Sequence, residues 1–130
     1  MMSMVLNMEI AEGIKLEEVT QALSFIAQSE ITNKNSSLEA YFPQSNVSIS
    51  AKIDLDDTNV LTEEIENANW KVGMRIYFDI DPTRPNALDE IKEFVIALSE
   101  ITSTYFALSF EYETLYAKRD KNGIVLSDEF

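Results

Sequence analysis

Six carboxylates lie within the thirteen residues from 54 to 66, with no basic residue between them. Such a run can attract a basic partner or hold a hard cation such as Ca²⁺, which prefers oxygen ligands. An EF-hand is excluded, because Asn59 and Ile65 stand where that loop needs a glycine and a bidentate glutamate. Calcium in another geometry, a basic partner and a solvated charged loop stay open as interpretations, and we expect no metal. The carboxylates are Asp54, Asp56, Asp57, Glu63, Glu64 and Glu66.

Glu111 and Glu113 form a second candidate pair of carboxylates. They continue an alternating apolar run from Phe106 to Tyr112, and residues two apart on a strand point the same way. Two carboxylates held roughly 5–9 Å apart can catalyse glycoside hydrolysis. Nothing in the sequence predicts a concave sugar cleft or an aromatic platform around them. We therefore interpret the pair as part of a solubilising or protein-binding sheet face.

The same parity argument maps the rest of that sheet face. A ferredoxin-like sheet places the first strand between the third and the last, so polar side chains of all three would be contiguous. A tyrosine surrounded by acids is an interface composition, because the ring anchors a partner and the acids bind lysine or arginine. For Arg75 we favour the role of an internal counterion of Glu9, Asp79 or Glu111. The face comprises Asn7, Glu9, Arg75, Tyr77, Asp79, Ser109, Glu111 and Glu113.

The charge balance favours binding over catalysis. The chain has 23 acidic and 10 basic residues, a formal net charge of −13 at pH 7, no histidine and no cysteine. Its field attracts cationic partners and repels nucleic acids and anionic membranes. The side chains most used for acid–base, nucleophilic and transition-metal chemistry are absent. We expect a protein that is not an enzyme, needs no cofactor and binds neither nucleic acid nor membrane.

Length and composition predict one domain spanning residues 1–130. With 45% hydrophobic residues the chain can build a core, and the lack of cysteine fits a reducing compartment. No stretch reaches the roughly 20 apolar residues that cross a bilayer. We expect a cytoplasmic protein.

Hydrophobic periodicity predicts the elements that position these residues. Alternation predicts strands over 2–10, 38–42, 47–55, 70–80, 104–118 and 124–126. Helical spacing predicts helices over 15–29 and 86–102, and polar runs predict loops over 32–37 and 54–69. The order β-α-β-β-α-β predicts an α+β fold, a two-layer ferredoxin-like sandwich with a C-terminal hairpin extension. Its mostly antiparallel sheet would carry both helices on one face and leave the other open.

A family resemblance is carried by the second half of the chain, in the segments FDID at 78–81, EFVIALS at 93–99 and FALSFEYE at 106–113. In these segments and in its small, acidic, mixed α/β character, the chain resembles immunity proteins of bacterial polymorphic and contact-dependent toxin systems. The resemblance implies an inhibitor that binds one cognate toxin domain with a basic surface, and it assigns no role to any single residue.

The alternative is an assembly or scaffold domain of ferredoxin-like type that associates with itself through its sheet. The candidates for such a contact are Val5, Tyr77, Tyr105 and Leu115. The net charge opposes close contact between like faces, so we expect a monomer or a weak dimer.

Overall fold

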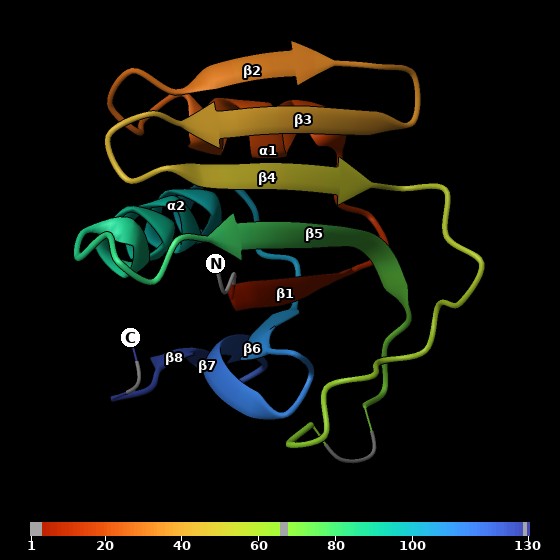
Figure 1. Cartoon of the computed structure of the whole chain (residues 1–130). Helices are drawn as coiled ribbons and strands as arrows, with labels where there is room; N and C mark the ends of the chain where they lie inside the picture. The colour runs from red at the N-terminus through yellow and green to blue at the C-terminus, as the bar shows by residue number, and fades with distance from the viewer. Residues whose placement is uncertain (1–3, 66–67, 129) are drawn as a thin grey trace.

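The computed structural model describes residues 4–65, 68–128 and 130. The elements in this part of the chain are β1 (Met4–Ala11), α1 (Leu16–Leu23), β2 (Glu30–Asn33), β3 (Ser37–Phe42), β4 (Val47–Lys52), β5 (Val72–Ile80), α2 (Ala87–Ile101), β6 (Phe106–Phe110), β7 (Thr114–Asp120) and β8 (Gly123–Leu126). The strands form one sheet in the order β2-β3-β4-β5-β1-β6-β7-β8, and neighbours run antiparallel throughout (Figure 1).

The predicted fold class is wrong. The chain forms one wide antiparallel sheet of eight described strands with two helices, not a two-layer ferredoxin-like sandwich whose helices cover one face. At about 4.8 Å between neighbouring strands, the sheet is about 34 Å wide, whereas each helix with its side chains is only about 10 Å across. Two helices, one of them only eight residues long, are therefore too few to form a covering layer.

Two errors in the element assignment account for the difference. The segment Glu30–Asn33 is strand β2 and pairs with β3, whereas the prediction left residues 30 and 31 unassigned and placed 32 and 33 in a loop. The segment 104–118, read as one strand, is the hairpin of β6 and β7. Its turn holds Glu111 and Tyr112 at φ values of 51° and 65°, which end the alternating run. The left-handed region is rare for non-glycine residues, so neither residue signals a turn by its type.

Both helices lie near their predicted places. Helix α1 is shorter than predicted and ends at Leu23 instead of Ser29. In the turn that follows, Gln28 adopts a left-handed φ of 60°, and the Ser29 hydroxyl donates to the Leu23 carbonyl (2.8 Å). Helix α2 is capped at its C-terminus by Arg119, which donates to the carbonyls of Ser99 (2.8 Å) and Thr102. Neither helix of the described chain has the length and apolar character needed to cross a membrane.

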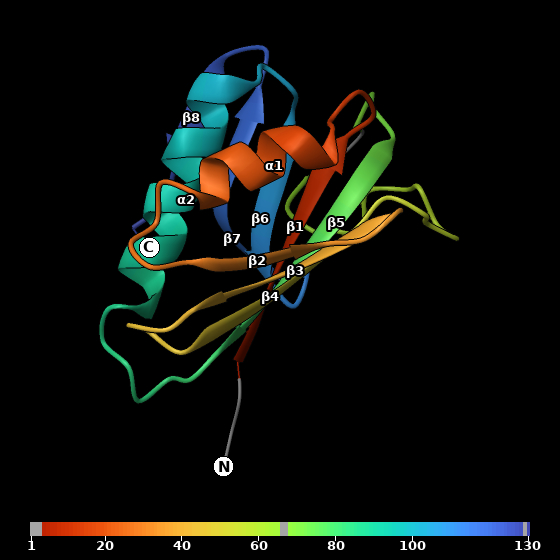
Figure 2. The ribbon, with the colours of Figure 1, turned by 90° about the horizontal axis from the view of Figure 1, so that it is seen from above.

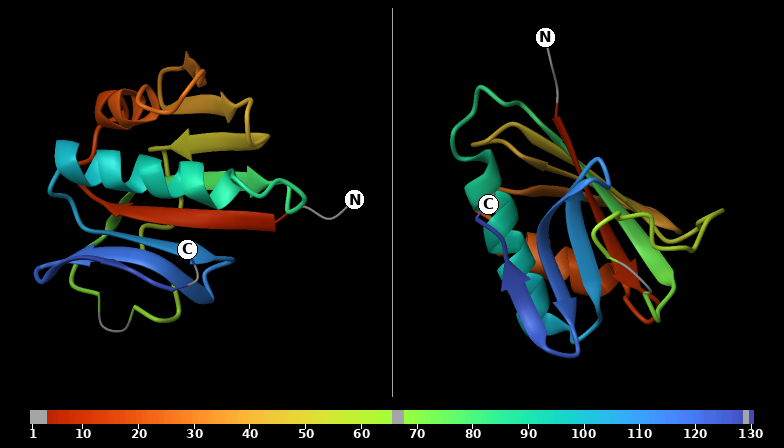
Figure 3. Two further views of the ribbon diagram at one scale, coloured as in Figure 1. Left: turned by 90° about the vertical axis from the view of Figure 1, so that its left-hand side faces the viewer. Right: turned by 90° about the horizontal axis from the view of Figure 1, so that it is seen from below.

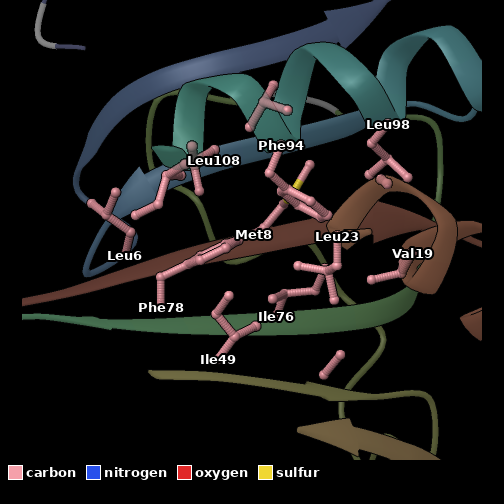
Figure 4. Close-up of a cluster of buried hydrophobic side chains, with 14 of the residues drawn as sticks. Leu6, Met8, Val19, Leu23, Ile49, Ile76, Phe78, Phe94, Leu98 and Leu108 are labelled. Carbon is pink, nitrogen blue, oxygen red and sulfur yellow. The ribbon is translucent and has the colours of Figure 1, made fainter. Parts of the chain in front are cut away.

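The hydrophobic core lies where the helices meet the middle of the sheet (Figure 4). Helix α1 crosses α2 (Figure 2). In the close-up, Leu23 of α1 and Phe94 of α2 point toward the side chains of the central strands (Figure 4). The rings of Phe78 and Phe94 meet with centroids 5.7 Å apart. The alternation predicted in the first strand is confirmed on this side, since Leu6, Met8 and Ile10 are all buried.

Candidate functional site

Strand pairing brings several of the predicted site residues together on the sheet face that points away from this core. In the register of β1 and β5, Glu9 lies opposite Arg75, and Asp79 lies opposite Val5. Tyr77 lies opposite Asn7 on β1 and Ser50 on β4. The central strands thus place Glu9, Arg75, Tyr77 and Asp79 on one face, as parity predicts.

Glu9 and Arg75 form a buried ion pair. The Arg75 Nη2 atom lies 3.0 Å from Glu9 Oε2, and the two residues are 5% and 0% exposed. The role of Arg75 as a counterion of Glu9 is therefore confirmed. Taking two charges out of water is costly, so such a pair needs further hydrogen bonds to its remaining polar atoms.

The segment between β4 and β5 provides these hydrogen bonds. The Glu9 carboxylate accepts from the backbone N–H groups of Leu61 (2.9 Å) and Thr62 (3.0 Å) and from the Thr62 hydroxyl (2.6 Å). Arg75 donates to the carbonyls of Asp57 and of Asn59 (2.6 Å). We call residues 54–65 the strap. Every one of these contacts fixes the backbone or a hydroxyl of the strap.

The strap lies over the sheet face that was expected to be open (Figure 3, right). Beneath it, Ser109 is buried with its hydroxyl 3.5 Å from that of Thr62, and its cross-strand neighbour Asn7 is buried as well. The expectation of eight contiguous exposed side chains is therefore wrong. Of the central set, Tyr77 stays half-buried and Asp79 exposed beyond the edge of the strap.

The strap carboxylates point to solvent. Asp54, Asp56, Asp57, Glu63 and Glu64 are all exposed, whereas Glu66 lies outside the described residues. Asp57 accepts from the Asn59 N–H (2.9 Å), and Glu64 accepts from the Leu115 N–H. Among the described residues, no three carboxylates converge on a position where they could hold a metal ion. The strap is thus an acidic surface whose backbone is fixed from below.

Glu111 and Glu113 do not form the predicted pair on a strand. Both are exposed in the β6–β7 turn, where the Glu113 N–H donates to the Phe110 carbonyl (2.9 Å). Left-handed backbone at Glu111 breaks the period of two, so their side chains do not share an orientation through strand parity.

The residue between them, Tyr112, joins the turn to the strap. Its carbonyl accepts from the Glu63 N–H (2.7 Å), and its hydroxyl is hydrogen-bonded to Tyr77. Burial raises the pKa of Tyr112 above its ordinary value of 10.0, and the hydrogen bond with Tyr77 raises it further. Tyr112 links the strap to the exposed end of the face.

A groove of about 730 Å³ occupies that exposed end, over β1 to β5. Two tyrosines, Tyr41 and Tyr77, stand among three carboxylates, and none of the described residues that line the groove is basic. Lys34 reaches one of the acids from outside, with Nζ 3.6 Å from Glu39. The polar lining consists of Glu30, Thr32, Glu39, Tyr41, Ser48, Ser50, Tyr77 and Asp79.

Sequence reasoning missed the parts of this groove that come from β2, β3 and β4, including Ser48 and Ser50 of β4. The short strand at 38–42 was predicted, and its alternation already places Glu39 and Tyr41 opposite to the buried Leu38 and Phe42. These two residues were not counted with the sheet face, because that face was assembled only from the strands predicted over 2–10, 70–80 and 104–118. Glu30 and Thr32 belong to β2, whose polar sequence gives no periodic signal.

The apolar residues proposed for self-association are not prominent on the surface, since Val5, Tyr77, Tyr105 and Leu115 are each half-buried. Comparison of the chain with models of protein families, with curated proteins and with solved structures finds no match.

Proposed function

We propose that this protein is a non-enzymatic binding module of the bacterial cytoplasm that captures a basic surface of another protein. By its resemblance to immunity proteins, we propose a cognate toxin domain as the partner, held in an inhibited state. The observation that carries the proposal is the groove over β1 to β5, which combines tyrosine rings with carboxylates and has no basic residue among its described lining.

The composition of the groove suits a protein partner better than a small substrate. Tyr41 and Tyr77 offer rigid rings that bury apolar area at little entropic cost, and Glu39 and Asp79 offer acceptors for lysine or arginine. Strand β4 in the middle of the groove is paired with β3 on one side and with β5 on the other, so the lining strands are fixed relative to one another. A surface formed in advance binds with less loss of conformational entropy.

The strap extends the groove into a larger acidic surface. Arg75 under the strap is only two residues from Tyr77 in the groove, and both lie on the same face of β5. The outward carboxylates of the strap are therefore on the same side of the molecule as the groove. A partner seated on Tyr77 can contact both acidic regions at once.

The charge of the whole molecule supports rapid capture of such a partner. A net charge of −13 acts beyond the contact residues, and complementary potentials raise association rates up to roughly 10⁸–10⁹ M⁻¹s⁻¹ at low salt. Inhibition of a toxin requires that the complex form before the toxin finds its substrate.

The test is calorimetric titration with the protein encoded by the neighbouring gene, because immunity genes lie next to the genes of their toxins. We expect Tyr77→Ala and Asp79→Lys each to weaken binding by at least about tenfold, the range for residues at the centre of an interface. Glu93→Lys is the matched control, since it makes the same charge change at an exposed position on α2.

Unchanged affinity in both groove variants would remove the groove from the proposal. If Glu93→Lys and Asp79→Lys weaken binding equally, the effect comes from net charge alone and not from the groove. Absence of binding by the unmodified protein would remove the toxin assignment.

A further inference from the structure

Strand β2 forms one edge of the sheet, and its outer side is free in the described chain (Figure 1). At the β2–β3 turn the Lys34 N–H donates to the Ser37 carbonyl (2.9 Å). In an antiparallel pair, hydrogen-bonded residues alternate with residues whose backbone groups point outward. Counting back from Lys34, Thr32 and Glu30 bond to β3, and the N–H and C=O groups of Ile31 and Asn33 point to the free edge.

The side chains of β2 make this edge two-sided. Glu30 and Thr32 lie on the groove face, beside Tyr41 and Glu39 of β3. Ile31 lies on the opposite side, half-buried against the hydrophobic core. A strand added to this edge therefore meets acids on one face and an apolar side chain on the other.

We propose that β2 takes up an extended segment of the partner as an additional antiparallel strand. The segment carries lysine or arginine at alternate positions on the groove face and apolar residues between them. This inference rests on the proposed function and specifies how the partner enters the groove. Such strand addition gives affinity through main-chain hydrogen bonds and specificity through alternate side chains.

The geometry sets the spacing of the basic residues. An added strand lies about 4.8 Å beyond β2, and alternate residues along it are about 6.8 Å apart. Two basic side chains at that spacing stand opposite Glu30 and Thr32, and the second reaches across Thr32 toward Glu39. A second copy of this chain is a poor occupant, because two molecules of charge −13 repel each other.

The probe is the capped peptide Thr-Val-Arg-Val-Lys-Thr, compared with Val-Thr-Arg-Lys-Thr-Val, which has the same composition but adjacent basic residues. We expect the alternating peptide to bind more tightly in a titration followed by ¹⁵N NMR. On binding, amide hydrogens of Ile31 and Asn33 should become protected from exchange. The amide of Thr32, already bonded to β3, should change little in protection.

Backbone methylation of the probe isolates the strand pairing. Residues directly opposite Ile31 and Asn33 point their N–H groups at β2, and these are the two valines. N-methylation of both valines should weaken binding by more than about tenfold. N-methylation of the arginine and lysine should leave it within about twofold, because those N–H groups point away.

Three results would overturn the strand addition. The two methylated peptides could bind with equal affinity, or only the peptide methylated at its basic residues could lose affinity. The third is that no peptide binds at all. The variant Glu39→Lys separates this failure from that of the proposed function. If Glu39→Lys weakens binding of either basic peptide while methylation does not, the groove captures cations without pairing to β2. If methylation at the valines matters and Glu39→Lys does not, the edge pairs but the groove does not select charge.

Discussion

Glu9 on β1 and Arg75 on β5 are cross-strand neighbours joined by a 3.0 Å ion pair, and both lie under the strap. The Glu9 carboxylate and both Nη atoms of Arg75 also bond to strap atoms 16 to 53 residues away in sequence, whereas Arg75 Nε is buried without a partner. This pair therefore holds the backbone of an acidic segment that has no regular secondary structure. The segment is fixed in place on the same sheet that forms the groove.

Loss of Glu9 should destabilise the fold strongly. The variant Glu9→Ala leaves the Arg75 guanidinium buried without a counterion, which we expect to cost about 3–5 kcal/mol of unfolding free energy in urea denaturation. The control is Lys34→Ala, which breaks an ion pair in which both side chains are more than half exposed and should cost about 0–1 kcal/mol. Similar losses in the two variants would contradict a structural role of the buried pair.

The left-handed turn between β6 and β7 should be improved by glycine. Glu111 adopts a φ of 51°, where a side chain is disfavoured, so Glu111→Gly should raise stability by about 1 kcal/mol. The control for charge is Glu113→Gly, which also removes one carboxylate from this turn but at a residue without a positive φ. A gain in stability from Glu113→Gly equal to that from Glu111→Gly would assign the effect to charge rather than backbone strain.

The state of Tyr112 predicts a loss of stability at alkaline pH. Its pKa is raised in the folded protein, chiefly by burial, so the unfolded chain releases this proton first as the pH rises above about 10. The contribution of Tyr112 is therefore complete below pH 10 and falls as the pH rises toward the folded value. In urea denaturation at pH 8 and pH 11, Tyr112→Phe should lose less stability between the two than the unmodified protein. An identical loss in both proteins would contradict the shift.

The oligomeric state separates capture of a foreign partner from self-association. We expect light scattering to report a monomer at both 50 mM and 500 mM salt, since the apolar candidates for self-contact are half-buried. A dimer that persists at every salt concentration would favour an assembly role through the sheet. A dimer that appears only at high salt would identify charge repulsion as the factor that keeps copies apart.

Periodicity predicted the strands that form the centre of the sheet and both helices, because each buries one face in the core. Strand β2 was not predicted, because Glu30, Thr32 and Asn33 are polar and only Ile31 touches the core. The β6–β7 turn was not predicted, because the alternating pattern runs through Glu111 without a glycine, proline or asparagine to interrupt it.

The candidate site was predictable only where it lies on regular strands. Tyr77 and Asp79 follow from the parity of β5, and Arg75 follows as the partner of Glu9. The cover over this pair was not predictable, because the strap contacts Glu9 across 52 and 53 residues through backbone N–H groups and a hydroxyl. Because every residue except proline has a backbone N–H, the residue types of a segment do not indicate which of its N–H groups will bind a carboxylate.

The most direct test of an acidic capture surface is the association rate with the protein encoded by the neighbouring gene, measured by stopped flow from 50 mM to 500 mM salt. We predict a rate that falls steeply as salt rises, and a slope that Asp79→Lys reduces more than Glu93→Lys does. A rate independent of salt, or equal slopes for the two variants, would contradict capture through the groove face.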